Sequence, residues 1–186
     1  MSTRSRSALA AIVLFSLSAT LLPAQEVEGN NRVGLWGGFG LGAGLLGCLE
    51  SGCSHDEWGF SGRGQLGGTL SPSIRLAGGT NGFYKEIDEV DFTVGALTAQ
   101  VQWYPNEGDF FLVGGAGFSW VEVSASFEGL TVSDSETGAA FVAGLGYDLS
   151  INKSGSLALT PFFNWVVTTV DPTIDFLQFG LGLTFN

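Results

Sequence analysis

Hydrophobic and polar positions alternate strictly along residues 176–186 of the chain. A period of two residues is typical of a β-strand with one apolar face. The second face holds glutamine, glycine and threonine, and such small polar residues offer little to fill a core. A strand with lipid on one side and a narrow lumen on the other has this pattern, and so does a strand of a soluble barrel or sandwich whose apolar face turns inward. The residues expected to face lipid are Leu177, Phe179, Leu181, Leu183 and Phe185.

Seven further segments of the chain show the same alternation. In the fifth of them the more aromatic face, with Phe110, Phe118 and Trp120, is expected to point outward. About ten residues per crossing suit a tilted strand that spans a bilayer. The pattern therefore predicts an all-β protein, an eight-stranded antiparallel up-and-down transmembrane β-barrel, with an acidic loop at 85–91 and a polar loop at 128–137. The seven segments are expected at about 33–45, 58–70, 74–84, up to 103, 109–127, 139–149 and 157–167.

The phase of the alternation also predicts which polar side chains enter the lumen. An eight-stranded barrel has an interior that side chains fill, and buried charges must be paired or solvated. Arg63 or Arg75 is therefore expected to pair with Asp148, directly or through water. We interpret the set as a plug that holds the barrel shut, with a gated narrow conduit as the alternative. The polar residues expected inside are Arg63, Arg75, Asp148, Asn164, Gln65, Gln100, Gln102 and Gln178.

The first residues have the pattern of an export signal. Arg4 and Arg6 precede an apolar run at 8–22, and a small residue, Ala24, follows at a plausible cleavage point. This arrangement predicts a secretory signal peptide of residues 1–24 and a mature barrel domain of residues 25–186. An N-terminal membrane anchor is the alternative, but the apolar run is short for a span.

The two cysteines of the chain, Cys48 and Cys53, are close together in one polar segment. Export to an oxidising compartment favours a disulfide between them. The short spacing makes this a local staple of one loop, and two free thiols are the alternative.

Composition narrows the class of protein further. Hydrophobic residues make up 45% of the chain and charged residues only 13%, which is about half of the usual charged share. The formal net charge of −11 argues against nucleic acid as a partner, since that binding needs a basic patch. The 29 glycines weaken strands in general, but they suit a small barrel that curves sharply around a crowded interior.

Few residues suggest catalysis or metal binding. The single histidine, His55, stands beside Ser54, Asp56 and Glu57, and neighbours in sequence seldom form a working triad. The sequence has no phosphate-binding loop and no zinc-like cluster. We therefore expect no catalytic, cofactor or metal site. Carboxylates gathered in the expected outer loops suit divalent cations that bridge to lipopolysaccharide phosphates, or simply a solvated surface.

With its leader, eight alternating segments, short turns and the ending L-Q-F-G-L-G-L-T-F, the chain resembles small bacterial outer-membrane β-barrels of the OmpA/OmpX/OmpW kind. The chain departs from that pattern at Asn186, because these barrels usually end on the aromatic residue. The resemblance implies export to the outer membrane of a Gram-negative bacterium, with lipid, lipopolysaccharide and the barrel assembly machinery as partners of a monomer.

The same resemblance implies a function of a general kind. It favours a non-enzymatic barrel with a structural or surface-interaction role. A porin-like narrow conduit for small or apolar solutes, as in the OmpW-like barrels, is the alternative. A lipid A-modifying enzyme is a minor alternative, because such enzymes resemble this chain only in architecture.

Overall fold

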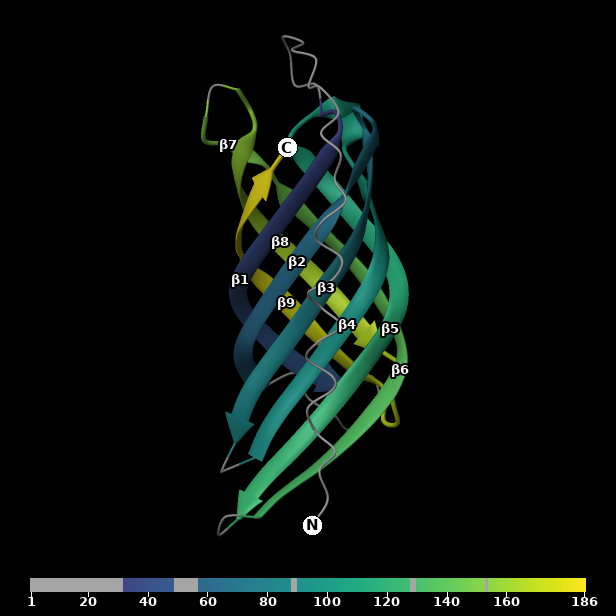
Figure 1. The fold of residues 1–186 in the computed structure, drawn as a ribbon, viewed down its shortest axis with the longest axis vertical. Coiled ribbons are helices and arrows are strands. Elements are labelled where there is room, and N and C mark those ends of the chain that lie inside the picture. The colour runs from purple at the N-terminus through teal and green to yellow at the C-terminus, as the bar shows by residue number, and fades with distance from the viewer. Residues whose placement is uncertain (1–31, 49–56, 88–89, 128–129, 153) are drawn as a thin grey trace, which may run out of the picture.

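A computed structural model describes residues 32–48, 57–87, 90–127, 130–152 and 154–186, and these residues form a tall barrel of tilted strands (Figure 1). One short 3₁₀ helix, Pro105–Glu107, lies in a turn between two of these strands. Among the described residues, no helix has the length and hydrophobicity to cross a membrane. The strands are β1 Leu35–Cys48, β2 Glu57–Ser71, β3 Ile74–Ile87, β4 Val90–Trp103, β5 Phe110–Phe127, β6 Leu130–Tyr147, β7 Leu149–Ser150, β8 Leu157–Thr168 and β9 Ile174–Phe185.

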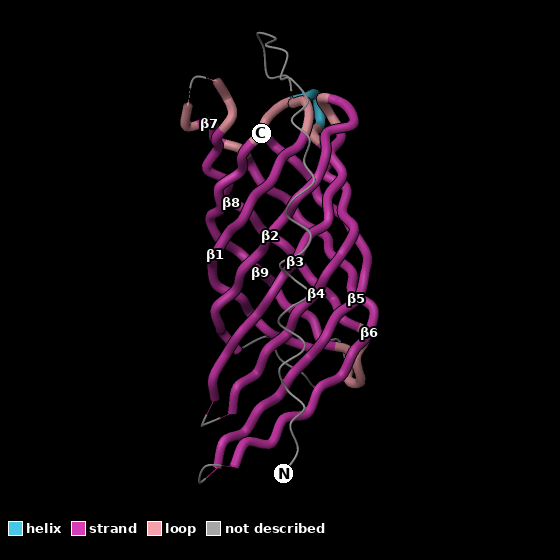
Figure 2. The backbone as a smooth tube through the Cα atoms, viewed as in Figure 1, coloured by secondary structure: helices cyan, strands magenta, loops and turns pink. Residues whose placement is uncertain are grey.

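The sheet closes on itself. Consecutive strands from β1 to β6 pair antiparallel, β8 pairs with β9, and β9 pairs with β1. The ladder between β6 and β8 joins the two ends of the sheet, while the two-residue β7 adds a small pairing beside the start of β8. In the side view of Figure 2, strands at the front and at the back of the barrel cross each other. The predicted eight-stranded up-and-down barrel is confirmed, with β7 as a minor addition.

The two ends of the barrel differ in shape. At one end, called the terminal end below, lie the start of β1, the C-terminus and the turns 72–73, 104–109 and 148–156 (Figure 1). At the opposite end, called the extended end, β3 to β6 run beyond the loop that joins β8 to β9, and the β5–β6 hairpin reaches furthest. The barrel is therefore a closed cylinder with a projecting sheet on one side.

The projecting sheet corrects two predicted loops. The acidic segment 85–91 and the polar segment 128–137 were expected as loops, but β3 extends to Ile87, β4 begins at Val90 and β6 begins at Leu130. The prediction assumed that strands end where their apolar alternation ends. Here the backbone groups are satisfied by pairing across the hairpins, at Ile87 with Val90 and at Phe127 with Leu130. Polar side chains do not prevent such backbone pairing.

Side chains alternate between the outer wall and the lumen along each strand. In β5, Phe118 is 57% exposed and Phe111 is 1% exposed, so the predicted outward phase of this strand is confirmed. An apolar cluster fills the lumen toward the extended end and is called the apolar half. Its buried members are Phe83, Val94, Ala96, Val121, Ala140, Val142, Val166, Val170 and Phe176. The rest of the lumen, toward the terminal end, is rich in polar side chains and is called the polar half.

Candidate functional site

The centre of the polar half is a cluster of Arg75, Tyr104 and Asp148, which three different segments bring together. The Nη1 atom of Arg75 donates to the Tyr104 hydroxyl over 3.0 Å, and the same hydroxyl donates to Oδ2 of Asp148 over 2.9 Å. Nη1 of Arg75 lies 3.9 Å from that carboxylate oxygen. Thr160 donates to the other oxygen, Oδ1, over 2.8 Å. The buried carboxylate is thus held by one charge and two hydroxyl groups.

Tyr104 stays neutral in this cluster. It lies in the turn after β4, outside the strands that cross the barrel wall. Burial, and then the negative charge of Asp148, raise the pKa of its phenol well above the ordinary value. The protonated phenol therefore links Arg75 to Asp148 at neutral pH by accepting from the one and donating to the other.

Arg32, which precedes β1, and Asn186, which follows β9, contact the cluster at the terminal end. The guanidinium of Arg32 lies 3.8 Å from the centre of the Tyr104 ring and donates to the carbonyl of Gly108 over 2.8 Å. Oδ1 of Asn186 accepts from Nη2 of Arg75. The polar half is therefore covered from both sides of its mouth by side chains that contact the central cluster.

Glutamines extend the network into the lumen along β2 and β4. Gln65 donates to Gln100 over 2.6 Å and accepts from Gln102 over 3.0 Å. Gln100 donates to the hydroxyl of Thr98 over 2.8 Å. This ladder places amide groups where an open channel would need space.

A second amide cluster lies deeper in the barrel, next to the apolar half. Asn164 donates to Gln178 over 3.0 Å and to Asn81 over 3.2 Å. Gln178 in turn donates to the backbone carbonyl of Gly62 over 2.8 Å. These bonds tie β3, β8 and β9 to β2 across the lumen.

The residues that the sequence singled out do lie inside the lumen. Arg63, Arg75, Asp148 and Asn164 are all buried. Of the two arginines, Arg75 is the one within ion-pair distance of Asp148. Arg63 instead lies with its guanidinium 3.8 Å from the centre of the Phe162 ring.

Three members of the network were missed by the sequence reasoning, namely Arg32, Tyr104 and Asn186. The phase of β4 continues inward through Tyr104, so alternation alone could have found it. Arg32 follows the inward phase of β1, but Gly34 interrupts the strand with a φ of 82°, a value that favours glycine. No comparable signal marks Asn186.

The C-terminal strand turns its apolar face away from the lumen. Leu181 and Phe185 are exposed on the outer wall, whereas Gln178 and Thr184, on the opposite face of the same strand, are buried. Leu177, Phe179 and Leu183 share the outward phase and are partly exposed. Residues 1–24, the side chain of Cys48, Cys53 and His55 lie outside the described residues.

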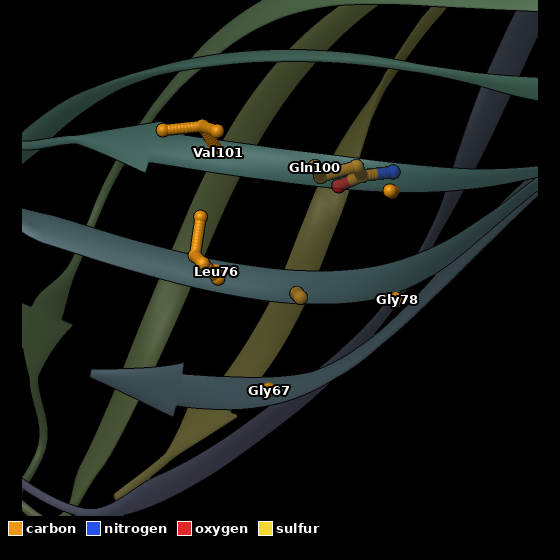
Figure 3. A pocket seen from close by; sticks show the side chains of 7 residues that line it. Gly67, Leu76, Gly78, Gln100 and Val101 are labelled. Atoms are coloured by element: carbon orange, nitrogen blue, oxygen red, sulfur yellow. The ribbon is translucent and has the colours of Figure 1, made fainter. Parts of the chain in front are cut away.

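A shallow pocket crosses the wall over β2, β3 and β4 (Figure 3). Gly67, Gly78 and Gln100 line it together with apolar side chains, and none of the lining residues titrates. Leu76 and Val101, which also line it, are exposed on the outer wall. In the part of the chain that the structure describes, no group of three or more His, Cys, Asp or Glu residues is placed to hold a metal ion. Side chains therefore fill the lumen, and hydrogen bonds between them connect strands on different sides of the barrel.

Comparison with solved structures finds small outer-membrane barrels. Ail, the attachment invasion locus protein of Yersinia pestis, is 19% identical, with a TM-score of 0.61, and the match covers 82% of this chain and 99% of Ail. Ail in complex with the heparin analogue sucrose octasulfate gives 18% identity and a TM-score of 0.63, with the same coverage. Neisserial surface protein A is 15% identical with a TM-score of 0.55, covering 81% of this chain and 96% of that protein.

The similarity to these proteins is one of fold, because their sequence identity to this chain is low. No curated protein matches the chain by sequence. The family model described as "Outer membrane protein beta-barrel domain" matches residues 7–185, which is nearly the whole chain. The chain therefore belongs to the outer membrane protein β-barrel family.

Proposed function

We propose that this protein is a non-enzymatic outer-membrane barrel that binds a partner at the cell surface through its extended end. The family is one of outer membrane proteins. In such barrels the short turns face the periplasm and the longer connections face outward. The short turns of the terminal end support the same orientation here, so the projecting part of β3 to β6 faces the medium.

A filled lumen argues against a conduit as the main role. In the apolar half, the rings of Phe83 and Phe176 lie 6.0 Å apart and both side chains are buried. In the polar half, Arg75, Tyr104 and Gln102 are buried and hydrogen-bonded to one another or to Asp148. A solute would have to displace both layers.

The proposal rests mainly on the projecting β5–β6 hairpin. The ladder between β6 and β8 stops at Ala140, and the hairpin runs on to Phe127 and Leu130. Ala139 still exchanges hydrogen bonds with Thr169, so nine residues of β6, 130–138, extend beyond these contacts, or about 30 Å of extended strand. Within the described residues, no strand pairs with this stretch on the side opposite β5. Such an edge offers unpaired backbone groups to an extended partner segment.

The charges of the projection indicate the kind of partner. The described residues of the projecting sheet include one basic side chain, Lys85, against five carboxylates, and the sheet therefore suits a basic protein surface. It suits a sulfated polyanion poorly, which contrasts with the heparin analogue in the Ail complex. Divalent cations that bridge carboxylates to lipopolysaccharide fit the same charge. The five carboxylates belong to Glu86, Asp91, Glu122, Asp134 and Glu136.

The proposal includes the route to the membrane and the state there. Residues 1–24 direct export and are removed after Ala24. The barrel assembly machinery inserts the chain as a monomer among lipid and lipopolysaccharide. The apolar outer face of Leu177, Phe179, Leu181, Leu183 and Phe185 meets lipid, and Cys48 and Cys53 form a disulfide in the loop after β1.

Binding to charged probes tests the surface role. The protein in lipid nanodiscs is presented with lysozyme as a basic probe and with heparin as an acidic one. We expect lysozyme to bind in a salt-sensitive way and heparin not to bind. The triple variant Glu122→Gln, Asp134→Asn and Glu136→Gln is expected to weaken lysozyme binding on the order of tenfold.

A matched control removes an exposed carboxylate at the opposite end. Glu107→Gln lies in the turn between β4 and β5, at the terminal end, and is expected to bind lysozyme like the unaltered protein. Equal binding by the triple variant, or a preference for heparin, would contradict the proposal. A steady single-channel current in planar bilayers would favour the conduit instead.

A further inference from the structure

Arg63 is a buried cation that the network of the polar half does not use. It projects from the middle of β2 into the lumen and is 7% exposed. Its guanidinium lies over the ring of Phe162. Among the described residues, nothing accepts a hydrogen bond from it, and its buried Nη1 atom has no partner. A buried charge with no hydrogen bond is costly, so we expect Arg63 to have a further partner in the folded protein.

The charges around Arg63 do not balance. Arg63 and Arg75 are both buried in the polar half, and Asp148 is the one buried carboxylate there among the described residues. The oxygens of Asp148 already accept from Tyr104 and Thr160, and Arg75 lies beside them. Arg32 has its own acid, Asp109, at 3.3 Å. One positive charge therefore remains without a counter-charge in a low-dielectric interior.

The neighbours of Arg63 are hydrogen-bond donors. Asn81 is its cross-strand partner on β3, and Ser61 lies two residues away on the same face of β2. The Nδ2 atom of Asn81 and the hydroxyl of Ser61 are buried without partners, as is the Nη1 atom of Arg63. Across the lumen, Asn164 contacts Asn81 and has one unpaired acceptor, Oδ1. Two unpaired donors beside an arginine that has an unpaired N–H group of its own suit an anion, and a cation would need carboxylates that the described residues do not place there.

We propose that the lumen holds a small inorganic monovalent anion of the chloride class against Arg63, with Asn81 and Ser61 as further donors. The anion balances the second arginine and satisfies donors that the protein leaves unpaired. Phe162 covers one face of the guanidinium, so the ligand approaches in its plane, where the N–H groups point. Because side chains fill the lumen on either side, the anion enters while the barrel forms.

Bromide locates the site directly, because it replaces chloride and gives an anomalous X-ray signal. The protein is refolded from urea in buffers with bromide as the only halide and is then crystallised. We expect an anomalous peak beside the Arg63 guanidinium, within reach of the Asn81 amide. Water alone at that place, linking Arg63 to Asp148, would overturn the proposal.

A solution experiment tests the same site without crystals. Urea unfolding is followed at fixed ionic strength while gluconate, a bulky organic anion, is replaced by chloride. A ligand bound only to the folded state raises the unfolding midpoint with its concentration. We expect this rise for the unaltered protein and its loss in Arg63→Met.

The matched control is Arg32→Met, which removes an arginine that has its own acid. This variant is expected to keep the chloride dependence. The proposal would be overturned if chloride does not change the unfolding midpoint of the unaltered protein, or if it raises the midpoint of Arg63→Met by the same amount. If Arg63→Met does not refold, the bromide map and the response of the unaltered protein still decide.

Discussion

The two halves of the lumen fill the same barrel by different means. The apolar half is a cluster of valines, alanines and two phenylalanines, whose rings lie 6.0 Å apart. The polar half is a chain of hydrogen bonds that runs from Arg75 through Tyr104 to Asp148. Dispersion contacts are many and individually weak, while a buried charge depends on a few specific partners. Both halves block the lumen, but only the polar half depends on particular atoms.

This difference predicts how each half responds to substitution. Cores that keep volume and polarity tolerate exchange among apolar residues. A buried polar network loses the bond and also leaves the partner unsatisfied when one member is removed. The variants that follow are all measured in one way, as urea unfolding in phospholipid vesicles followed by tryptophan fluorescence.

The largest effect is expected from Asp148→Leu in the polar half. The change leaves Arg75 buried without its carboxylate and takes the acceptor from Tyr104 and Thr160. Breaking a buried pair on one side costs about 3–5 kcal/mol of unfolding free energy. The double variant with Arg75→Met should recover part of the loss, because the unpaired cation is gone. Simple addition of the two single losses would show that the residues do not act as a pair.

The next effect is expected from Gly44→Val in the apolar half. A Cβ atom at this position would lie 2.5 Å from Cδ2 of Phe83, which real contacts do not allow. Overpacking of this kind costs about 1–3 kcal/mol. Adding Phe83→Leu frees space and should restore part of the stability. If Gly44→Val is neutral, the apolar half is more loosely packed than the contact implies.

The sequence predicted the barrel because the cause is local. Each membrane-crossing strand needs an apolar face toward lipid and a small or polar face toward the lumen. This requirement produces an alternation that can be seen directly in the sequence. The phase of β5 followed from the same rule. The projecting sheet did not, because its acidic and polar segments lack the apolar alternation that marks the other strands. There the strands are held by backbone pairing, as between Phe127 and Leu130, and pairing leaves no mark on the side chains.

The site was predictable in its membership but not in its partners. Alternation placed Arg63, Arg75 and Asp148 in the lumen, because inward phase is a property of each strand alone. The choice of Arg75 as the partner of Asp148 depends on which strands meet at the same height across the barrel. Strand tilt and register determine that height, and a single sequence does not state them. The role of Asn186 at Arg75 depends on the same tertiary arrangement.

A smaller difference in unfolding free energy is expected between variants of two inward-facing residues on one strand. This pair compares apolar and polar packing most directly. Phe176 and Gln178 both point inward from β9 and are fully buried. Phe176→Leu keeps an apolar group of similar volume and should cost less than about 1.5 kcal/mol. Gln178→Leu removes the side-chain donor to the carbonyl of Gly62 and one of the two acceptors of the Asn164 amide, and should cost about 1–3 kcal/mol. A reversed order would mean that volume, not polarity, controls this layer.

The smallest effect is expected from Lys85→Met, at the extended end and outside both halves. Lys85 pairs with Glu57, whose side chain is about half exposed, and water screens such a pair. The expected loss is about 1 kcal/mol or less, and it should vanish in high salt. Arg75 and Asp148 form the same kind of charge pair inside the lumen, so their larger effect comes from burial. Two results would contradict this: a loss for Lys85→Met as large as that for Asp148→Leu, or a loss that salt does not change. Either result would mean that burial does not explain the different stabilities of the two pairs, and the contrast between the filled lumen and the water-exposed projection would be wrong.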